Sequence, residues 1–253
     1  MHRIINEILE STKNRVQTLP EPKKRRIDAR SFRESIKASK QQHLIPVISE
    51  VKPSSPTRFI RTVTPQDAAE IAGQMEAAGA AAISVLTEPQ FFKGSIENLD
   101  SVRRAVKVPV LRKDFIIDKA QICEAKSDLV LLIAGILGEK LDNFVNEAIS
   151  YGREPLVEVH NRMELENALL TSAGIIGINN RDLTTMKVDI TTTEKLAPLI
   201  SGRIIISESG ISTPQEAVRM IEAGADAILV GTSIMQGNIY EKTYELVHAL
   251  NGR

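Results

Sequence analysis

The sequence HLIPVISEVK at residues 43–52 begins as an apolar run and ends in the charged residues Glu50 and Lys52. The same arrangement recurs in VPVLRKDF at 108–115 and in PLVEVH at 155–160. A strand that is buried on both faces reads as a continuous run of Val, Ile and Leu. Charged residues that recur at one end of such strands therefore predict a shared polar rim, which is where barrel enzymes carry their chemistry.

Eight apolar runs of this kind occur along the chain, separated by segments with helical periodicity. In order, the runs begin at His43, Ala81, Val108, Ser127, Pro155, Gly174, Arg203 and Ala227. The segment at 65–80 places Ala68, Ile71 and Met75 on one stripe, as an amphipathic helix requires. Strand and helix thus alternate eight times, and this alternation predicts a parallel sheet closed into a single (β/α)8 TIM barrel.

The length of the chain fits one domain. Its 253 residues match the roughly 250 that are typical of a single barrel, so we expect the barrel at 43–253 and an N-terminal helical extension at 1–42. Ile5 and Ile8 lie on the apolar face of the first predicted helix. This face must be buried, so we expect the extension to close the bottom of the barrel or to line its active-site side. The basic run KKRR at 23–26 is interpreted as solvated.

Composition excludes several classes of function. Lys plus Arg equals Asp plus Glu at 32 each, so we expect no nucleic-acid partner and no membrane partner. The longest apolar run is too short to span a bilayer. Cys123 is the single cysteine, and no signal sequence opens the chain, so we expect a cytoplasmic protein. The four histidines show no paired spacing, and no metal is predicted. We interpret His160 as a rim histidine with a hydrogen-bond partner.

Strand parity identifies the charged side chains that meet inside the rim. Alternate residues of a strand share a face, so the predicted inward set is Glu50, Lys52, Lys113, Glu158 and Asn179. Buried charges must be paired, and this set can neutralise itself. A lysine that is partly desolvated beside another cation can act as an acid near neutral pH, whereas nearby carboxylates can hold it charged. The alternative is a network that only ties the strands together.

The last two strand ends suggest a phosphate site. SESG at 207–210 and VGTS at 230–233 supply Ser209, Gly210, Gly231 and Thr232. The loops after strands seven and eight are the recurring phosphate site of this architecture. Ser55, in the first loop, adds a hydroxyl. The alternative is that the glycines are ordinary turn residues.

These motifs resemble the indole-3-glycerol phosphate synthase family. ISEVKPSSP, SVLTEPQFFKGSIENL, VPVLRKDFIID, LVEVH, GINNRDL, SESGI and VGTSIM follow one another between about 45 and 237, in the family's order. The resemblance implies ring closure of 1-(2-carboxyphenylamino)-1-deoxyribulose 5-phosphate, with loss of carbon dioxide and water, and it implies that no cofactor is needed. We expect a phosphorylated small-molecule substrate and a monomer. Association with other enzymes of the pathway stays open.

The resemblance also implies roles for individual residues. Lys113 corresponds to the general acid that protonates the substrate carbonyl, and Glu158 to the acid/base of the dehydration. Lys52 would contact the carboxylate or act as second proton donor. Glu50 would orient a lysine, and Asn179 would bind sugar hydroxyls or the developing oxyanion. The residues implied to position or enclose the anthranilate ring are Arg181, Phe115, Leu132 and Leu183, and those implied to bind the phosphate are Ser55, Ser209, Gly210, Gly231 and Thr232.

Two other functions are compatible with these residues. A desolvated lysine in a barrel can form an imine, which favours a Schiff-base aldolase or lyase on a sugar phosphate. Borohydride trapping of an adduct on Lys52 or Lys113 would identify that chemistry. The second is a non-catalytic barrel that binds phosphates, for which calorimetry would detect a ligand while no indole fluorescence appears.

Overall fold

A closed barrel of eight parallel strands forms the centre of the molecule. The computed structural model describes residues 1–19 and 26–250. The barrel strands are β1 (Val47–Val51), β4 (Ala82–Leu86), β5 (Val110–Lys113), β6 (Leu129–Ile133), β7 (Glu154–Val159), β8 (Ile175–Asn179), β9 (Ile204–Glu208) and β10 (Ala227–Val230), and β10 pairs with β1 to close the ring. All eight predicted strands are confirmed. The (β/α)8 prediction is confirmed with them.

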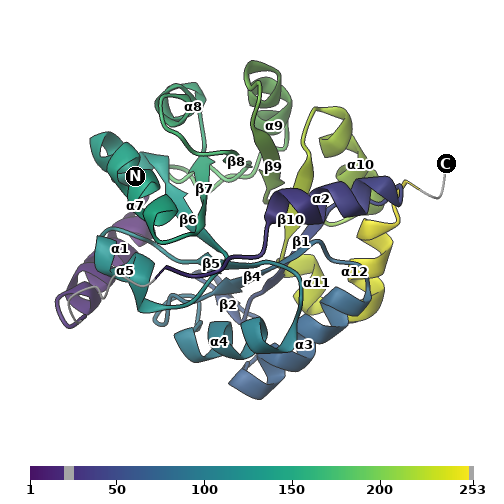
Figure 1. Ribbon diagram of the computed structural model, residues 1–253, viewed down its shortest axis with the longest axis horizontal. Helices are drawn as coiled ribbons and strands as arrows, with labels where there is room; N and C mark the ends of the chain where they lie inside the picture. The colour runs from purple at the N-terminus through teal and green to yellow at the C-terminus, as the bar shows by residue number, and fades with distance from the viewer. Residues whose placement is uncertain (20–25, 251–253) are drawn as a thin grey trace.

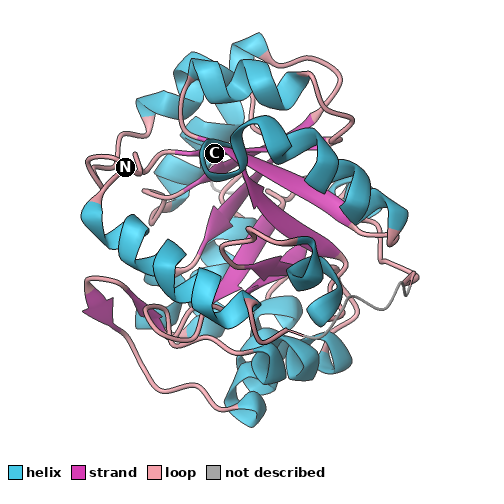
Figure 2. Ribbon diagram, turned by 90° about the vertical axis from the view of Figure 1, so that its left-hand side faces the viewer, coloured by secondary structure: helices cyan, strands magenta, loops and turns pink. Residues whose placement is uncertain are grey.

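Helices surround the strands on the outside (Figures 1 and 2). They are α3 (Pro65–Ala77), α4 (Ile96–Ala105), α5 (Lys119–Glu124), α6 (Ala134–Leu137), α7 (Leu141–Ser150), α8 (Arg162–Leu169), α9 (Thr191–Leu196), α10 (Pro214–Glu222), α11 (Thr232–Gln236) and α12 (Ile239–Val247), with short 3-10 turns at Gly138–Lys140 and Ala197–Leu199. A small hairpin of β2 (Ser54–Ser55) and β3 (Arg58–Phe59), which the sequence did not predict, follows β1. Within the described residues, no helix is long and apolar enough to cross a membrane.

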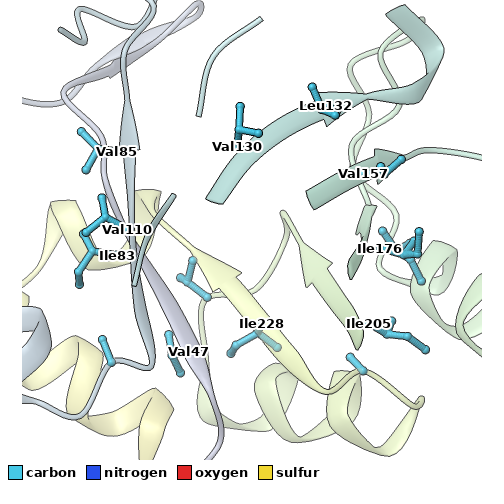
Figure 3. Packing of buried hydrophobic residues seen from close by; sticks show 14 of the residues in the cluster. Val47, Ile83, Val85, Val110, Val130, Leu132, Val157, Ile176, Ile205 and Ile228 are labelled. Carbon is cyan, nitrogen blue, oxygen red and sulfur yellow. The ribbon is translucent and has the colours of Figure 1, made fainter. Parts of the chain in front are cut away.

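Two apolar cores follow from the alternation of side chains along each strand. Val47 and Val51 of β1 pack outward in the core between the strands and the helices, where Figure 3 shows their counterparts from the other strands. Ile48, between them in sequence, belongs to the second core inside the barrel. Glu50 must therefore point inward too, as the predicted parity requires.

Capping residues and glycines define the ends of several helices. Thr213 accepts a hydrogen bond from the backbone N–H of Glu216, whose side chain bonds back to the cap, and Pro214 begins α10. Gly79 has φ +96° and Gly224 has φ +104°. Glycine adopts this left-handed conformation without steric cost, so both residues let the chain turn from a helix into the next strand.

The N-terminal extension covers both ends of the barrel. Helix α2 (Phe32–Gln41) lies at the bottom, where the backbone N–H of Phe32 donates to Glu154 Oε2 (2.8 Å) at the start of β7. Helix α1 (Arg3–Val16) lies at the other mouth, where the backbone N–H of His2, its N-cap, donates to the carbonyl of Leu183 (2.8 Å). The extension was expected to close the bottom of the barrel or to line the other mouth, and it does both, with one helix at each end. Most of the KKRR run, residues 23–25, lies outside the described residues.

Candidate active site

An ammonium group surrounded by three carboxylates occupies the centre of the barrel mouth. Lys113 Nζ lies 3.8 Å from the nearest carboxylate oxygens of Glu50, Glu158 and Glu208. These side chains come from four strands, β5, β1, β7 and β9, and the three carboxylates are at most 3% exposed. Lys52 Nζ lies 3.4 Å from Glu50 Oε1. The predicted convergence of two lysines with Glu50 and Glu158 is confirmed.

The cluster sets unusual protonation states. Burial lowers the pKa of Lys113, but the three carboxylates outweigh burial and raise it well above its ordinary value. Burial raises the pKa of Glu158, but Lys113 and His160 outweigh it and lower that pKa to about 2. Burial and the charge of Glu158 raise the pKa of Glu208 to about 8. At neutral pH the site thus holds an ammonium ion, an ionised Glu158 and a protonated Glu208.

An apolar cavity of about 290 Å³ opens beside Lys113. Its apolar lining is Ile5, Pro56, Leu86, Phe92, Phe115, Leu131, Ile133, Leu183 and Met186. The rings of Phe92 and Phe115 have centroids 6.1 Å apart. The buried carboxylate of Glu88 accepts the backbone N–H groups of Gln90, Phe91 and Phe92, which fixes the loop that carries Phe92. The cavity therefore offers a flat aromatic group a preformed slot next to a proton donor.

The prediction for Leu132 was wrong. Leu132 is fully buried in the outer core between β6 and the helices, whereas its neighbours Leu131 and Ile133 line the cavity. The reason is parity, because side chains along β6 alternate between the two faces. Phe92 and Glu208 were missed. Glu208 shares the inward face of Ile204 and Ile206, so the same parity argument would have found it.

A second cavity of about 380 Å³ continues from the first toward β9 and β10. Its lining includes Ser209, Gly210, Gly231 and Thr232, the predicted phosphate residues. Both cavities share Lys52, Lys113, Arg181, Ser209 and Thr232. Ser55 lines the first cavity, and its hydroxyl donates to the carbonyl of Arg58 (3.3 Å). The site thus has an apolar end and a polar end that meet at the lysines.

The remaining predicted residues lie around this junction. Asn179 and Arg181 line the first cavity, and Asn179 Oδ1 accepts the backbone N–H of Arg181 (3.0 Å). Arg181 Nη1 donates to the carbonyl of Met186 (3.1 Å). Gly231 gives Glu50 its space, since a Cβ atom there would lie 2.5 Å from Glu50 Oε1. Across residues 1–19 and 26–250, no group of three or more His, Cys, Asp and Glu side chains could hold a metal ion.

The chain is similar in sequence to one enzyme family along nearly its whole length. The family model described as indole-3-glycerol phosphate synthase matches residues 2–246. The enzyme of that name from Halobacterium salinarum is 45% identical over 224 residues, 88% of each chain. That from Aquifex aeolicus is 47% identical over 210 residues, 79% of this chain and 80% of the relative.

Two solved structures share the fold at low sequence identity. The N-acetylmannosamine-6-phosphate 2-epimerase from Clostridium perfringens has a TM-score of 0.60 at 16% identity, covering 79% of this chain and 91% of that one. The (S)-3-O-geranylgeranylglyceryl phosphate synthase from Thermoplasma acidophilum has a TM-score of 0.59 at 14% identity, covering 88% and 98%. Similarity at this level shows the barrel architecture alone.

Proposed function

The chain belongs to the indole-3-glycerol phosphate synthase family, and on that premise we propose how its residues carry out the reaction. This carboxy-lyase closes the ring of 1-(2-carboxyphenylamino)-1-deoxyribulose 5-phosphate to give indole-3-glycerol phosphate in tryptophan biosynthesis. The substrate oxygen receives two protons and leaves as water, one proton leaves carbon, and the carboxylate departs as carbon dioxide. Each turnover therefore consumes one proton, and the site must supply both acids and a base.

In our proposal Lys113 is the acid of the first step. As the aryl carbon attacks the substrate carbonyl, negative charge develops on the carbonyl oxygen, and a positioned ammonium group can stabilise that charge and donate its proton. The observation that carries this assignment is the cluster itself, in which the carboxyl groups of Glu50, Glu158 and Glu208 lie 3.8 Å from Lys113 Nζ, and the negative charges of Glu50 and Glu158 keep Lys113 protonated. Asn179, which lines the same cavity, would bind the sugar hydroxyls or the oxyanion.

The apolar end of the site would hold the anthranilate ring. Phe92 and Phe115 form its aromatic wall beside Lys113, with Leu131, Ile133 and Leu183 completing the enclosure. Arg181, at the junction of the two cavities, would position the ring or its carboxylate. A ring held in this slot has little freedom, so its reacting carbon stays near the carbonyl that Lys113 protonates.

Glu158 would be the base that removes the proton from carbon during dehydration, since its carboxyl is ionised at neutral pH. Lys52 lines both cavities and would contact the substrate carboxylate or donate the second proton to the leaving hydroxyl. Glu208 adds a further proton donor, because its carboxyl keeps a proton near pH 7. Glu50 would orient both lysines, to which it lies within 3.8 Å.

The phosphate would occupy the polar end. Ser209 has φ +67° and Gly210 has φ +80°. These two successive left-handed residues line the second cavity, as do Gly231 and Thr232. Turns of this kind present N–H groups to anions, and Ser55 would add its hydroxyl. A phosphorylated small molecule is the partner that this site fits.

Three statements about the whole chain remain predictions: a monomer, a cytoplasmic location, and one domain made of the 1–42 extension and the 43–253 barrel. The ion pair between Arg15 of α1 and Asp114, next to Lys113, supports a single domain. Size-exclusion chromatography with light scattering measures the oligomeric state. A concentration-dependent dimer would contradict the monomer prediction.

The direct test of the function is an assay of the purified protein with the carboxyphenylamino deoxyribulose phosphate. We expect indole fluorescence to appear at a rate proportional to the protein concentration. Binding of substrate without fluorescence would support a non-catalytic barrel. The protonated state of Lys113 argues against an aldolase, because a lysine must lose its proton before it attacks a carbonyl. An adduct trapped by borohydride on Lys52 or Lys113 would reverse this argument.

A further inference from the structure

A histidine lies between two carboxylates at the end of β7. His160 follows Glu158 by two residues and has a side chain that is only 3% exposed. Its Nε2 atom lies 3.2 Å from Glu158 Oε1, and its Nδ1 atom lies 2.9 Å from Glu164 Oε2. The imidazole thus connects the proposed base of the reaction to a residue that is outside both cavities.

Glu164 is held firmly by the start of α8. Its carboxylate accepts the backbone N–H of His160 (2.9 Å) and the Nδ2 group of Asn161 (2.8 Å), the N-cap of the helix. Gly135 of α6 leaves room for it, since a Cβ atom there would lie 2.7 Å from Glu164 Oε1. Because Glu164 binds Nδ1, the ring must turn Nε2 toward Glu158. This is how an outer carboxylate fixes a functional imidazole.

We propose that His160, anchored by Glu164, is a positioning residue that holds the Glu158 carboxylate in place and ionised during the dehydration step. The inference rests on the proposed role of Glu158 as base. It adds to that role a function for His160, because a base needs a fixed orientation toward the hydrogen that it removes.

Glu158 needs a second neighbouring cation, because Lys113 loses its positive charge during the reaction. Lys113 gives up its proton when it protonates the substrate carbonyl, so one of the two positive charges beside Glu158 is then lost. His160 does not touch the cavities and keeps its charge throughout. A buried carboxylate without any cation nearby would take up a proton and cease to act as a base. The imidazolium therefore preserves the base between the two proton transfers.

The groups around the pair support a permanently charged imidazole. Burial lowers the pKa of His160, but Glu158 and Glu164 outweigh it and raise the pKa to about 10. The charged or titratable groups that face Glu158 or His160 are Lys113 on β5, Glu208 on β9, Glu164 on α8 and Asp182 after β8, and Asn179 on β8 adds a neutral amide. Glu208 holds a proton near pH 7, so the negative charges that favour a cation at 160 are those of Glu158, Glu164 and Asp182.

The test replaces His160 by Gln, which keeps a neutral donor, and measures kcat and KM across pH. We expect kcat of His160→Gln to fall by about tenfold or more, as for other residues that orient a catalytic group, with KM changed by less than about threefold. The acid limb of the kcat profile should move up by about one pH unit or more, because Glu158 loses a neighbouring cation. Glu164→Gln should move the limb in the same direction by less.

Matched variants separate this effect from a structural one. His248→Gln replaces a half-buried histidine, distant in sequence from the site, that stacks on Tyr244, and Glu166→Gln replaces an exposed glutamate on α8. Both should keep the wild-type profile. A wild-type acid limb in both His160→Gln and Glu164→Gln would overturn the inference. If His160→Gln does not fold, Glu164→Gln decides alone.

Glu158→Gln distinguishes failure of the inference from failure of the proposed role. Turnover at the wild-type level in Glu158→Gln would remove Glu158 from the mechanism. Loss of turnover in Glu158→Gln together with wild-type behaviour in His160→Gln and Glu164→Gln would leave Glu158 as base and refute only the role of His160. If the inference holds, adding His160→Gln to Glu158→Gln should cause no further loss, because both changes act on one group.

Discussion

Gly177 on β8 faces Glu208 on β9 so closely that a side chain at 177 would collide with the carboxylate. A Cβ atom at Gly177 would lie 2.3 Å from Glu208 Oε1 and 2.7 Å from Leu156 Cδ2. Real Cβ atoms do not approach other atoms this closely, so something must move. Because Gly177 has no side chain, β8 leaves space inside the narrow barrel for the carboxylate of Glu208.

Gly177→Ala should therefore damage both activity and stability. The added methyl group must displace Glu208 or Leu156, and overpacking of this kind costs about 1–3 kcal/mol. We expect the free energy of unfolding in urea to fall by that amount, and kcat to fall by roughly tenfold or more because the cluster is disturbed. Gly174→Ala is the control, since a Cβ atom there meets nothing within 4 Å. Equal stability of both variants would contradict the packing argument.

Glu208→Gln should reduce the loss of stability that accompanies a rise in pH from 5 to 8. The pKa of Glu208 is raised to about 8 from its ordinary 4.5, so between these values the folded protein keeps a proton that the unfolded chain has lost. Stability must fall as pH rises through this window. Gln cannot ionise, so the variant should lose less stability than the wild type between pH 5 and pH 8. Urea unfolding at both values measures the difference, and parallel losses would contradict the raised pKa.

Lys113→Ala should abolish most of the turnover. The variant removes the proposed acid and charge stabiliser, so we expect kcat to fall by on the order of a hundredfold or more, while the affinity for glycerol phosphate stays nearly unchanged. Lys195→Ala, at a side chain that is 69% exposed, is the control. The assay is indole fluorescence, and calorimetry measures the ligand. Unchanged turnover would remove Lys113 from the mechanism.

The central cluster could be predicted because polar residues mark the inward face of β1, β5 and β7. In β6 the sequence LVLLI contains no polar residue, so nothing in it indicates which side chains face the cavity, and Leu132 was assigned to the wrong side. Phe92 lies in a loop, where no periodicity orients a side chain. The placement of α1 and α2 depends on contacts with distant strands, which an amphipathic pattern alone does not specify.

Arg15→Ala should loosen the first helix from the active site. Arg15 Nη2 lies 2.9 Å from both carboxylate oxygens of Asp114, whose side chain is fully buried. Loss of a hydrogen bond to a charged group costs about 1–3 kcal/mol. We expect lower stability in urea and a higher KM, because α1 also brings Ile5 into the cavity. Arg3→Ala, at a side chain that is 90% exposed, should change neither value.

Ser209→Asp tests where the phosphate group of the substrate binds. Ser209 has φ +67°, a conformation that Asp and Asn adopt more readily than most residues, so the backbone of the turn should survive. A carboxylate at this position would face the phosphate in the second cavity, and repulsion between the two should raise KM by roughly tenfold or more. Ser209→Asn has the same shape without the charge and should raise KM much less. Equal KM values for the two variants would mean that charge at 209 does not act on the substrate, and the phosphate would then lie elsewhere.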